Sequence, residues 1–132
     1  MKTSDRLPRN FSRQATAALG KFFERGKTAV GMLKDGQVDA ALDMLQERTE
    51  AFHNFRVADA LVKNSGSHPE EVEMELKVLW VEIAKIDCEL RELLEFEFEN
   101  VKTELRNIAQ SKAKIGKYRS GYNEKVNFEY SI

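Results

Sequence analysis

Residues that break helices or cross-link chains are scarce in this sequence of 132 residues. It contains 7 Gly, 2 Pro and 1 Cys. A single cysteine, Cys88, cannot form an internal disulfide or a cysteine-based metal site, so we expect a cytoplasmic protein rather than one from an oxidising compartment. The chain is 42% hydrophobic and 33% charged. This composition, with so few glycines and prolines, predicts one all-α domain built from long helices.

Long hydrophobic runs are also missing. The longest covers only residues 78–81, whereas a membrane-spanning helix needs about 20 apolar residues. The first residues, MKTSDR, hold no apolar block of the kind that a signal peptide carries. We therefore expect neither a membrane span nor an export signal.

The charges nearly cancel overall but are unevenly placed. The chain has 21 basic and 22 acidic residues. Residues 1–34 hold 8 basic and 2 acidic residues, a net charge of +6, whereas residues 64–110 hold 5 and 12, a net charge of −7. This asymmetry is typical of antiparallel helices with complementary surfaces. Because there is no Lys/Arg cluster and no aromatic stacking platform, we expect no binding to nucleic acid.

The spacing of apolar residues predicts three helices, at about residues 10–34, 37–63 and 69–115. Gly36 is suited to end the first helix, and Pro69 to begin the third. Residues 1–9 are expected to be a polar lead-in that Pro8 closes. The predicted fold is therefore an antiparallel helical hairpin packed on one long C-terminal helix, a three-helix coiled-coil-like bundle spanning residues 10–116.

The third predicted helix is too long for the hairpin to cover. At about 1.5 Å per residue it would extend on the order of 70 Å, against about 40 Å for each hairpin helix. Its apolar residues follow a heptad to Leu90 and then spread over more than one face. This segment is the expected partner-binding surface, covered by a protein partner, by the loops of the hairpin or by a second copy of the chain in a homodimer. Its residues are Leu90, Leu93, Leu94, Phe96, Phe98 and Val101.

The C-terminal residues 117–132 differ in character from the helices. Turn-forming residues come first, and from Val126 to Ile132 apolar and polar residues then alternate as in a strand. Because the sequence offers no partner strand, we expect a flexible tail. The alternative is a peptide that adds to a sheet or groove of a partner.

The sequence contains no set of catalytic groups at useful spacing, so we expect no enzyme, no cofactor and no metal. Glu50 and His53 have the spacing of two metal ligands on one helical turn, but the second such motif that a di-iron bundle needs is missing. The residues around His53 loosely resemble the phosphoryl-accepting helix of histidine phosphotransfer domains. Those domains keep Gly where Val57 stands here.

Two stretches resemble a known family. Residues 33–52, LKDGQVDAALDMLQERTEAF, resemble the helical hairpin of flagellar export chaperones of the FliT and FlgN type. Residues 83–94, IAKIDCELRELL, with KIGKY at 114–118, look like the closing helix of those proteins.

This resemblance implies a cytoplasmic chaperone of type III export and bacterial flagellum biogenesis. Such a chaperone would bind the helical terminus of a late flagellar subunit, either the filament cap or a hook-filament junction protein, and pass it to the export gate. The acidic residues Glu92, Glu95, Glu97 and Glu99 would then steer a basic or amphipathic partner. Two alternatives stay open: a coiled-coil adaptor or dimerisation module unrelated to flagella, and a phosphotransfer protein that uses His53.

Overall fold

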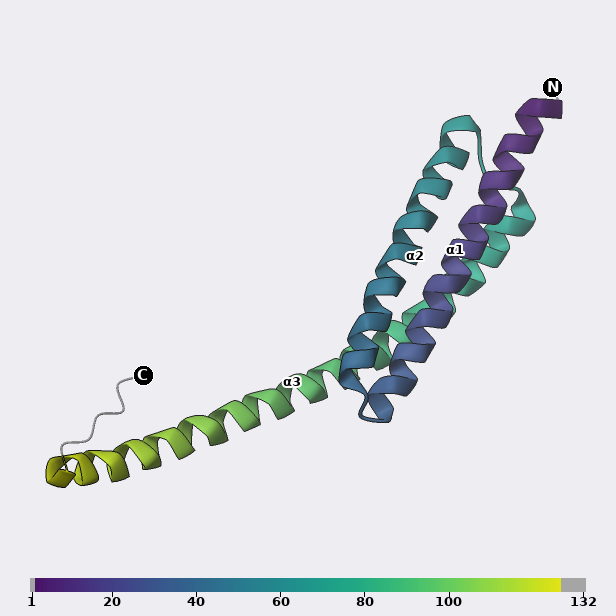
Figure 1. Ribbon diagram of the computed structural model, residues 1–132. Coiled ribbons are helices and arrows are strands. Elements are labelled where there is room, and N and C mark those ends of the chain that lie inside the picture. Colours follow the sequence, from purple (N-terminus) through teal and green to yellow (C-terminus); the bar gives the residue numbers. More distant parts are fainter. Residues whose placement is uncertain (1, 127–132) are drawn as a thin grey trace. The chain divides into compact units, whose positions relative to one another are not determined.

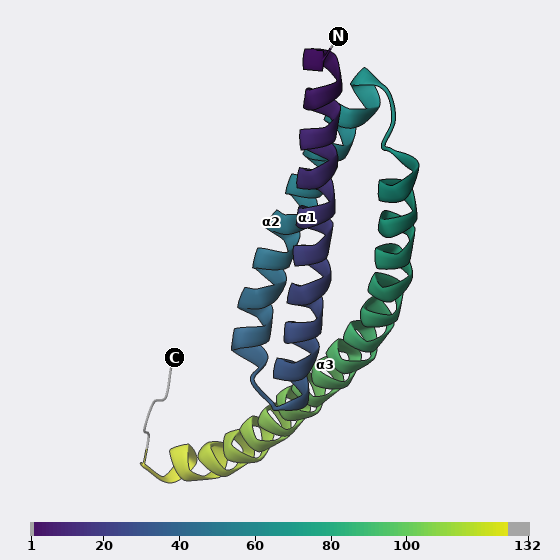
Figure 2. The same cartoon turned by 90° about the vertical axis from the view of Figure 1, so that its right-hand side faces the viewer.

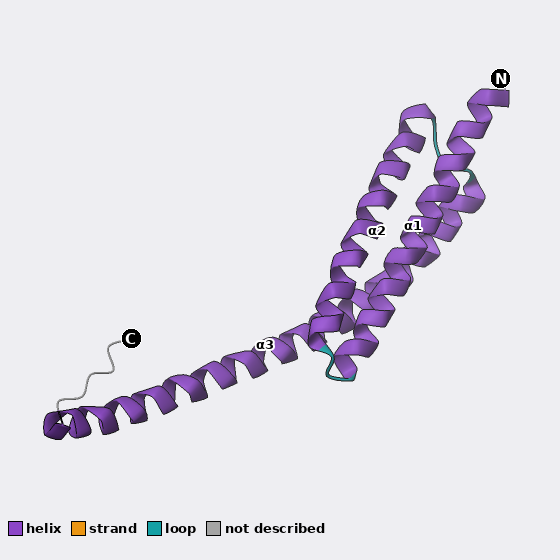
Figure 3. Cartoon of the chain, viewed as in Figure 1, coloured by secondary structure: helices purple, strands orange, loops and turns teal. Residues whose placement is uncertain are grey.

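The computed structural model describes residues 2–126, and the side chains of residues 10–116. Within these residues it contains three helices and no strand, as Figure 3 shows. The helices are α1 (Lys2–Lys34), α2 (Val38–Ser65) and α3 (Glu70–Val126). The predicted all-α fold is confirmed. No helix among the described residues is long and apolar enough to cross a membrane.

The chain divides into two compact units, and the boundary lies inside α3. Unit 1, residues 1–94, contains α1, α2 and the first part of α3. Unit 2 begins at Glu95 and is described as far as the end of α3 at Val126. Each unit is described in its own right below.

A tight turn joins α1 to α2 within unit 1, and the two helices run side by side in opposite directions (Figures 1 and 2). Gly36 adopts a positive φ of 78°, which glycine accepts without steric cost. The Gln37 N–H donates to the Met32 carbonyl at 2.8 Å, and the Gly36 N–H to the Leu33 carbonyl at 3.1 Å. These two bonds form a Schellman motif, so Gly36 ends α1 as predicted.

The core of unit 1 consists of two clusters, and all three helices contribute to each. Alanines are common in both clusters, and their small side chains let the helices approach closely. The first cluster contains Ala15, Ala18, Leu19, Phe55, Ala58, Leu76 and Ile83. The second contains Ala29, Val30, Leu33, Ala41 and Leu90. The first half of the α3 heptad therefore packs against the hairpin, as its spacing predicts.

A buried arginine connects the three helices between these clusters. Arg48 of α2 donates to the Phe22 carbonyl of α1 at 3.2 Å and to Asp87 of α3 at 2.7 Å. Its guanidinium also lies 3.9 Å from the centre of the Phe22 ring, a cation–π distance. A Cβ atom on Gly26 would lie 2.9 Å from Arg48 Nε and 2.8 Å from Ile86 Cγ2. Glycine at position 26 therefore leaves the space that this arginine occupies.

Two helices extend beyond their expected ends. α1 begins at Lys2 rather than at residue 10, and it continues through Pro8. A proline inside a helix removes one backbone donor and costs about 3 kcal/mol, which is why the sequence favoured a helix that starts after it. α3 runs through Gly116 to Val126, so residues 117–126 are helical and do not belong to a tail. A helical glycine costs only about 1 kcal/mol, which the neighbouring residues offset. The strand-like residues after Val126 lie outside the described residues.

Candidate protein-binding surface

The six residues expected to bind a partner fall on both sides of the boundary between the units. In unit 1, Leu90 is only 4% exposed and packs with Ala29 and Leu33 of α1. Leu93 and Leu94 are half-buried against the same cluster. The end of the hairpin therefore already covers Leu90, and it partly covers the two leucines that follow.

The other three expected residues lie in unit 2 and are open to solvent. Phe96 is 64% exposed, Phe98 61% and Val101 48%. Further along α3, Leu105, Ile108 and Ile115 are also about half exposed. Large apolar side chains in such number on one helix are unusual unless another molecule covers them.

Most of these exposed residues share one face of the helix. An α-helix turns by about 100° per residue, so spacings of three, four and seven keep side chains on one side. We call the five residues that follow this spacing the C-terminal stripe: Phe98, Val101, Leu105, Ile108 and Ile115. Phe96 lies about 200° around the helix from Phe98, and therefore on the opposite face. The last three members of the stripe were not among the expected site residues, although the heptad spacing already indicated them.

The two edges of the C-terminal stripe carry different charges. Glu97 and Glu104 flank it on one side, seven residues apart. On the other side lies Lys102, whose Nζ is 4.7 Å from the centre of the Phe98 ring and 3.5 Å from Glu99. Of the four glutamates expected to steer a partner, helix geometry thus places Glu97 directly beside the stripe. Glu95 and Glu99 lie further around the helix.

A polar cluster that the sequence did not reveal lies in unit 1. The Ser12 hydroxyl of α1 is 2.8 Å from His68 Nδ1, and His68 Nε2 donates to Asp59 Oδ1 of α2 at 2.7 Å. Lys63 Nζ lies 3.0 Å from the second Asp59 oxygen. Burial raises the pKa of Asp59, but the hydrogen bonds from His68 and Lys63, together with their charge, hold it below 3.8.

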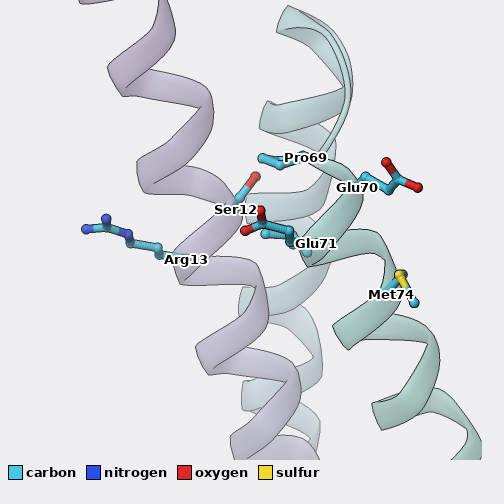
Figure 4. Close-up of a pocket in the computed structure, with 7 residues that line it drawn as sticks. Ser12, Arg13, Pro69, Glu70, Glu71 and Met74 are labelled. Carbon is cyan, nitrogen blue, oxygen red and sulfur yellow. The ribbon is translucent and has the colours of Figure 1, made fainter.

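This cluster combines the groups of a Ser-His-Asp triad, but its burial favours a structural role. Ser12 and His68 are only 2% and 5% exposed, so the hydroxyl is not presented to a substrate. Beside Ser12 there is an open cleft of about 500 Å³ between α1 and the start of α3. In Figure 4, Arg13 points away from this cleft on one side and Glu70 on the other. The cluster connects α1, α2 and the loop before α3.

The histidine of the phosphotransfer alternative lies on the surface. His53 and Glu50 are both exposed on α2, and His53 lines a shallow groove with Lys21, Asn54 and Val57. Among the described residues, no group of three His, Cys, Asp or Glu side chains is arranged to hold a metal ion.

The three helices define a class, the all-α helical bundles. Within this class, the chain belongs to the FliT family, because the family model described as flagellar protein FliT matches residues 3–120. The resemblance read from the sequence is thereby confirmed. The family implies a chaperone role related to the flagellum. Neither the curated proteins nor the solved structures contain a significant match to the chain.

Proposed function

We propose that this protein is a cytoplasmic export chaperone that binds the helical terminus of a late flagellar subunit. The client would be the filament cap or a hook-filament junction protein, held unassembled until it passes to the export gate. The observation that supports this proposal best is the C-terminal stripe, a row of exposed large apolar side chains on one face of α3 that only Lys112 interrupts.

The stripe fits a client helix with its own apolar residues at spacings of three and four. Such a helix would lie along α3 and bury Phe98, Val101 and Leu105 in the helix-in-groove mode. Burying one large apolar side chain contributes about 1.5–3 kcal/mol, while association costs about 4–15 kcal/mol. A stripe of five residues therefore gives binding of moderate strength. Moderate binding suits a chaperone that must release its client at the export gate.

Charge at the stripe sets the preferred orientation of the client. Because Glu97 and Glu104 lie along one edge, a client helix with Lys or Arg on the facing edge associates faster and in one direction. Lys102, on the other edge, favours an acidic residue of the client. The surface is thus directional as well as apolar.

Two phenylalanines with nearly equal exposure on opposite faces of α3 provide a matched test. Purified full-length chain is mixed with candidate late flagellar subunits, and the mass of the complex is measured by light scattering. We expect a one-to-one complex that Phe98→Glu abolishes and Phe96→Glu largely preserves, with unchanged helicity by circular dichroism. No complex with any late subunit would contradict the proposed client. If only Phe96→Glu abolished the complex, the client would bind the face of α3 opposite the C-terminal stripe, which would contradict the proposed site.

The exposed stripe also supports a second candidate, a dimerisation module. Two copies of α3 would then cover the apolar side chains of each other in a coiled coil. The same light-scattering experiment separates the two functions. The dimerisation module is supported if the chain forms a tight dimer, if Phe98→Glu dissociates this dimer, and if the dimer binds none of the flagellar subunits.

A further inference from the structure

The part of α3 that belongs to unit 1 has a second apolar face, which lies outside both core clusters. Its first residue, Met74, lines the cleft beside Ser12. Met74, Val78 and Val81 are each more than half exposed. Their spacings of four and three place them on one side of the helix, about 10 Å from end to end. We call these three residues the outer stripe.

The core does not require the outer stripe. The side of α3 that faces the hairpin carries Leu76 and Ile83, both buried. Met74 precedes Leu76 by two residues, and Val81 precedes Ile83 by two, which places each about 160° around the helix from that core residue. Polar side chains at these positions would leave both core clusters unchanged. A row of large apolar groups that folding does not need indicates a binding surface.

Acidic residues line one edge of the outer stripe. Glu71, Glu75, Glu82 and Glu89 follow one another at spacings of four, seven and seven. Glu82 pairs with Lys85, and Glu89 with Lys34. Glu75 is exposed and takes part in no ion pair among the described side chains, whereas Glu71 lines the cleft beside Ser12 (Figure 4). The opposite edge carries Glu70, Lys77 and Ala84 at spacings of seven, so it holds one acidic residue where the first edge holds four.

We propose that the outer stripe docks an amphipathic helix of a second protein, one with Lys or Arg along one edge and apolar residues at spacings of three and four. The acidic edge selects this occupant, because rows of opposite charge beside an apolar seam determine which helices pair and in which direction. A second copy of this chain, paired antiparallel, would set the acidic edge against itself. The same negative charge disfavours an anionic membrane surface.

This docking site is independent of the proposed client site. The outer stripe lies in unit 1 and the C-terminal stripe in unit 2, and they share no residue. A chaperone with two such surfaces has separate residues for its client and for a second protein.

The test uses two synthetic helical peptides with the same Leu residues at spacings of three and four. One peptide carries Lys along one edge, and the other carries Glu at the same positions. The probes are titrated into the full-length chain in the Leu105→Glu background, which disables the C-terminal stripe, and amide shifts are followed by NMR. We expect the Lys peptide to bind at least tenfold more tightly than the Glu peptide and to shift amides of residues 71–85.

Variants of the chain then locate the site. Val78→Ser should weaken binding of the Lys peptide at least tenfold, and Glu75→Gln about threefold with a smaller dependence on salt. Val101→Ser is the matched control on the other stripe and should change nothing. Equal binding of both peptides, shifts confined to residues 98–115, or no effect of Val78→Ser would overturn the proposal. Self-association that Val78→Ser abolishes would also overturn it, because a second copy would then be the occupant.

Discussion

The two parts of α3 have the same apolar spacing and differ in what covers it. In unit 1, Ile83 is 1% exposed because residues of α1 and α2 surround it. In unit 2, Leu105 continues the spacing and is 58% exposed. α1 has 33 residues, α2 has 28 and α3 has 57, which gives lengths of about 50, 42 and 86 Å. The spacing of apolar residues therefore defines one apolar face of α3. The lengths of α1 and α2 limit how many residues of that face can be buried.

The largest expected effect is a difference in the free energy of unfolding between alanine variants in the two parts of α3. Ile83→Ala should lower the free energy of unfolding by about 2–5 kcal/mol, because it removes buried methyl groups and leaves a cavity. Leu105→Ala should change it by less than about 0.5 kcal/mol, because its side chain is already in water. Urea denaturation of both variants measures the difference. Similar losses for the two would mean that the second part of α3 is also core.

Replacing either of two glycines in α1 with alanine should change stability by a smaller amount. The two substitutions should act in opposite directions. Gly26→Ala should destabilise the protein by about 1–2 kcal/mol, because the new Cβ would displace Arg48 and Ile86. Gly31→Ala should stabilise it by up to about 1 kcal/mol, because nothing lies within 4 Å and alanine favours a helix. Thermal melting of both variants compares them. Stabilisation by both substitutions would refute the close approach at position 26.

The smallest expected effect is the contribution of Asp59, in the polar cluster of unit 1, to stability at low pH. Because the pKa of Asp59 is lower in the folded chain than its ordinary 3.8, its ionised form stabilises the fold above that pH. That contribution disappears as the pH falls below 3.8 through the folded-state pKa. We therefore expect Asp59→Asn to be less stable than wild type at neutral pH and to lose less stability on acidification. Parallel stability curves for the two proteins between pH 5 and 2 would contradict this account of Asp59.

Local sequence patterns predicted the hairpin, the turn at Gly36 and the packed half of the α3 heptad, because each depends on neighbouring residues. The predicted outer ends of α1 and α3 were wrong, because both helices continue through a residue that disfavours a helix. Inside a helix, a proline such as Pro8 costs about 3 kcal/mol and a glycine such as Gly116 about 1 kcal/mol. Contacts between distant residues were not predictable. Ser12 and His68 are 56 positions apart, and no spacing relates them. For the same reason, the sequence did not distinguish buried Leu90 from exposed Phe98.

The central claim is that the C-terminal stripe is a docking surface, whereas the matching residues of unit 1 are core. Amide hydrogen exchange of the full-length chain, alone and with a late flagellar subunit, tests it most directly. We predict that residues 76–90 are protected in both samples, and that residues 98–115 exchange quickly alone and slowly in the complex. Fast exchange at residues 98–115 in a confirmed complex would contradict the claim, because the client would then bind elsewhere.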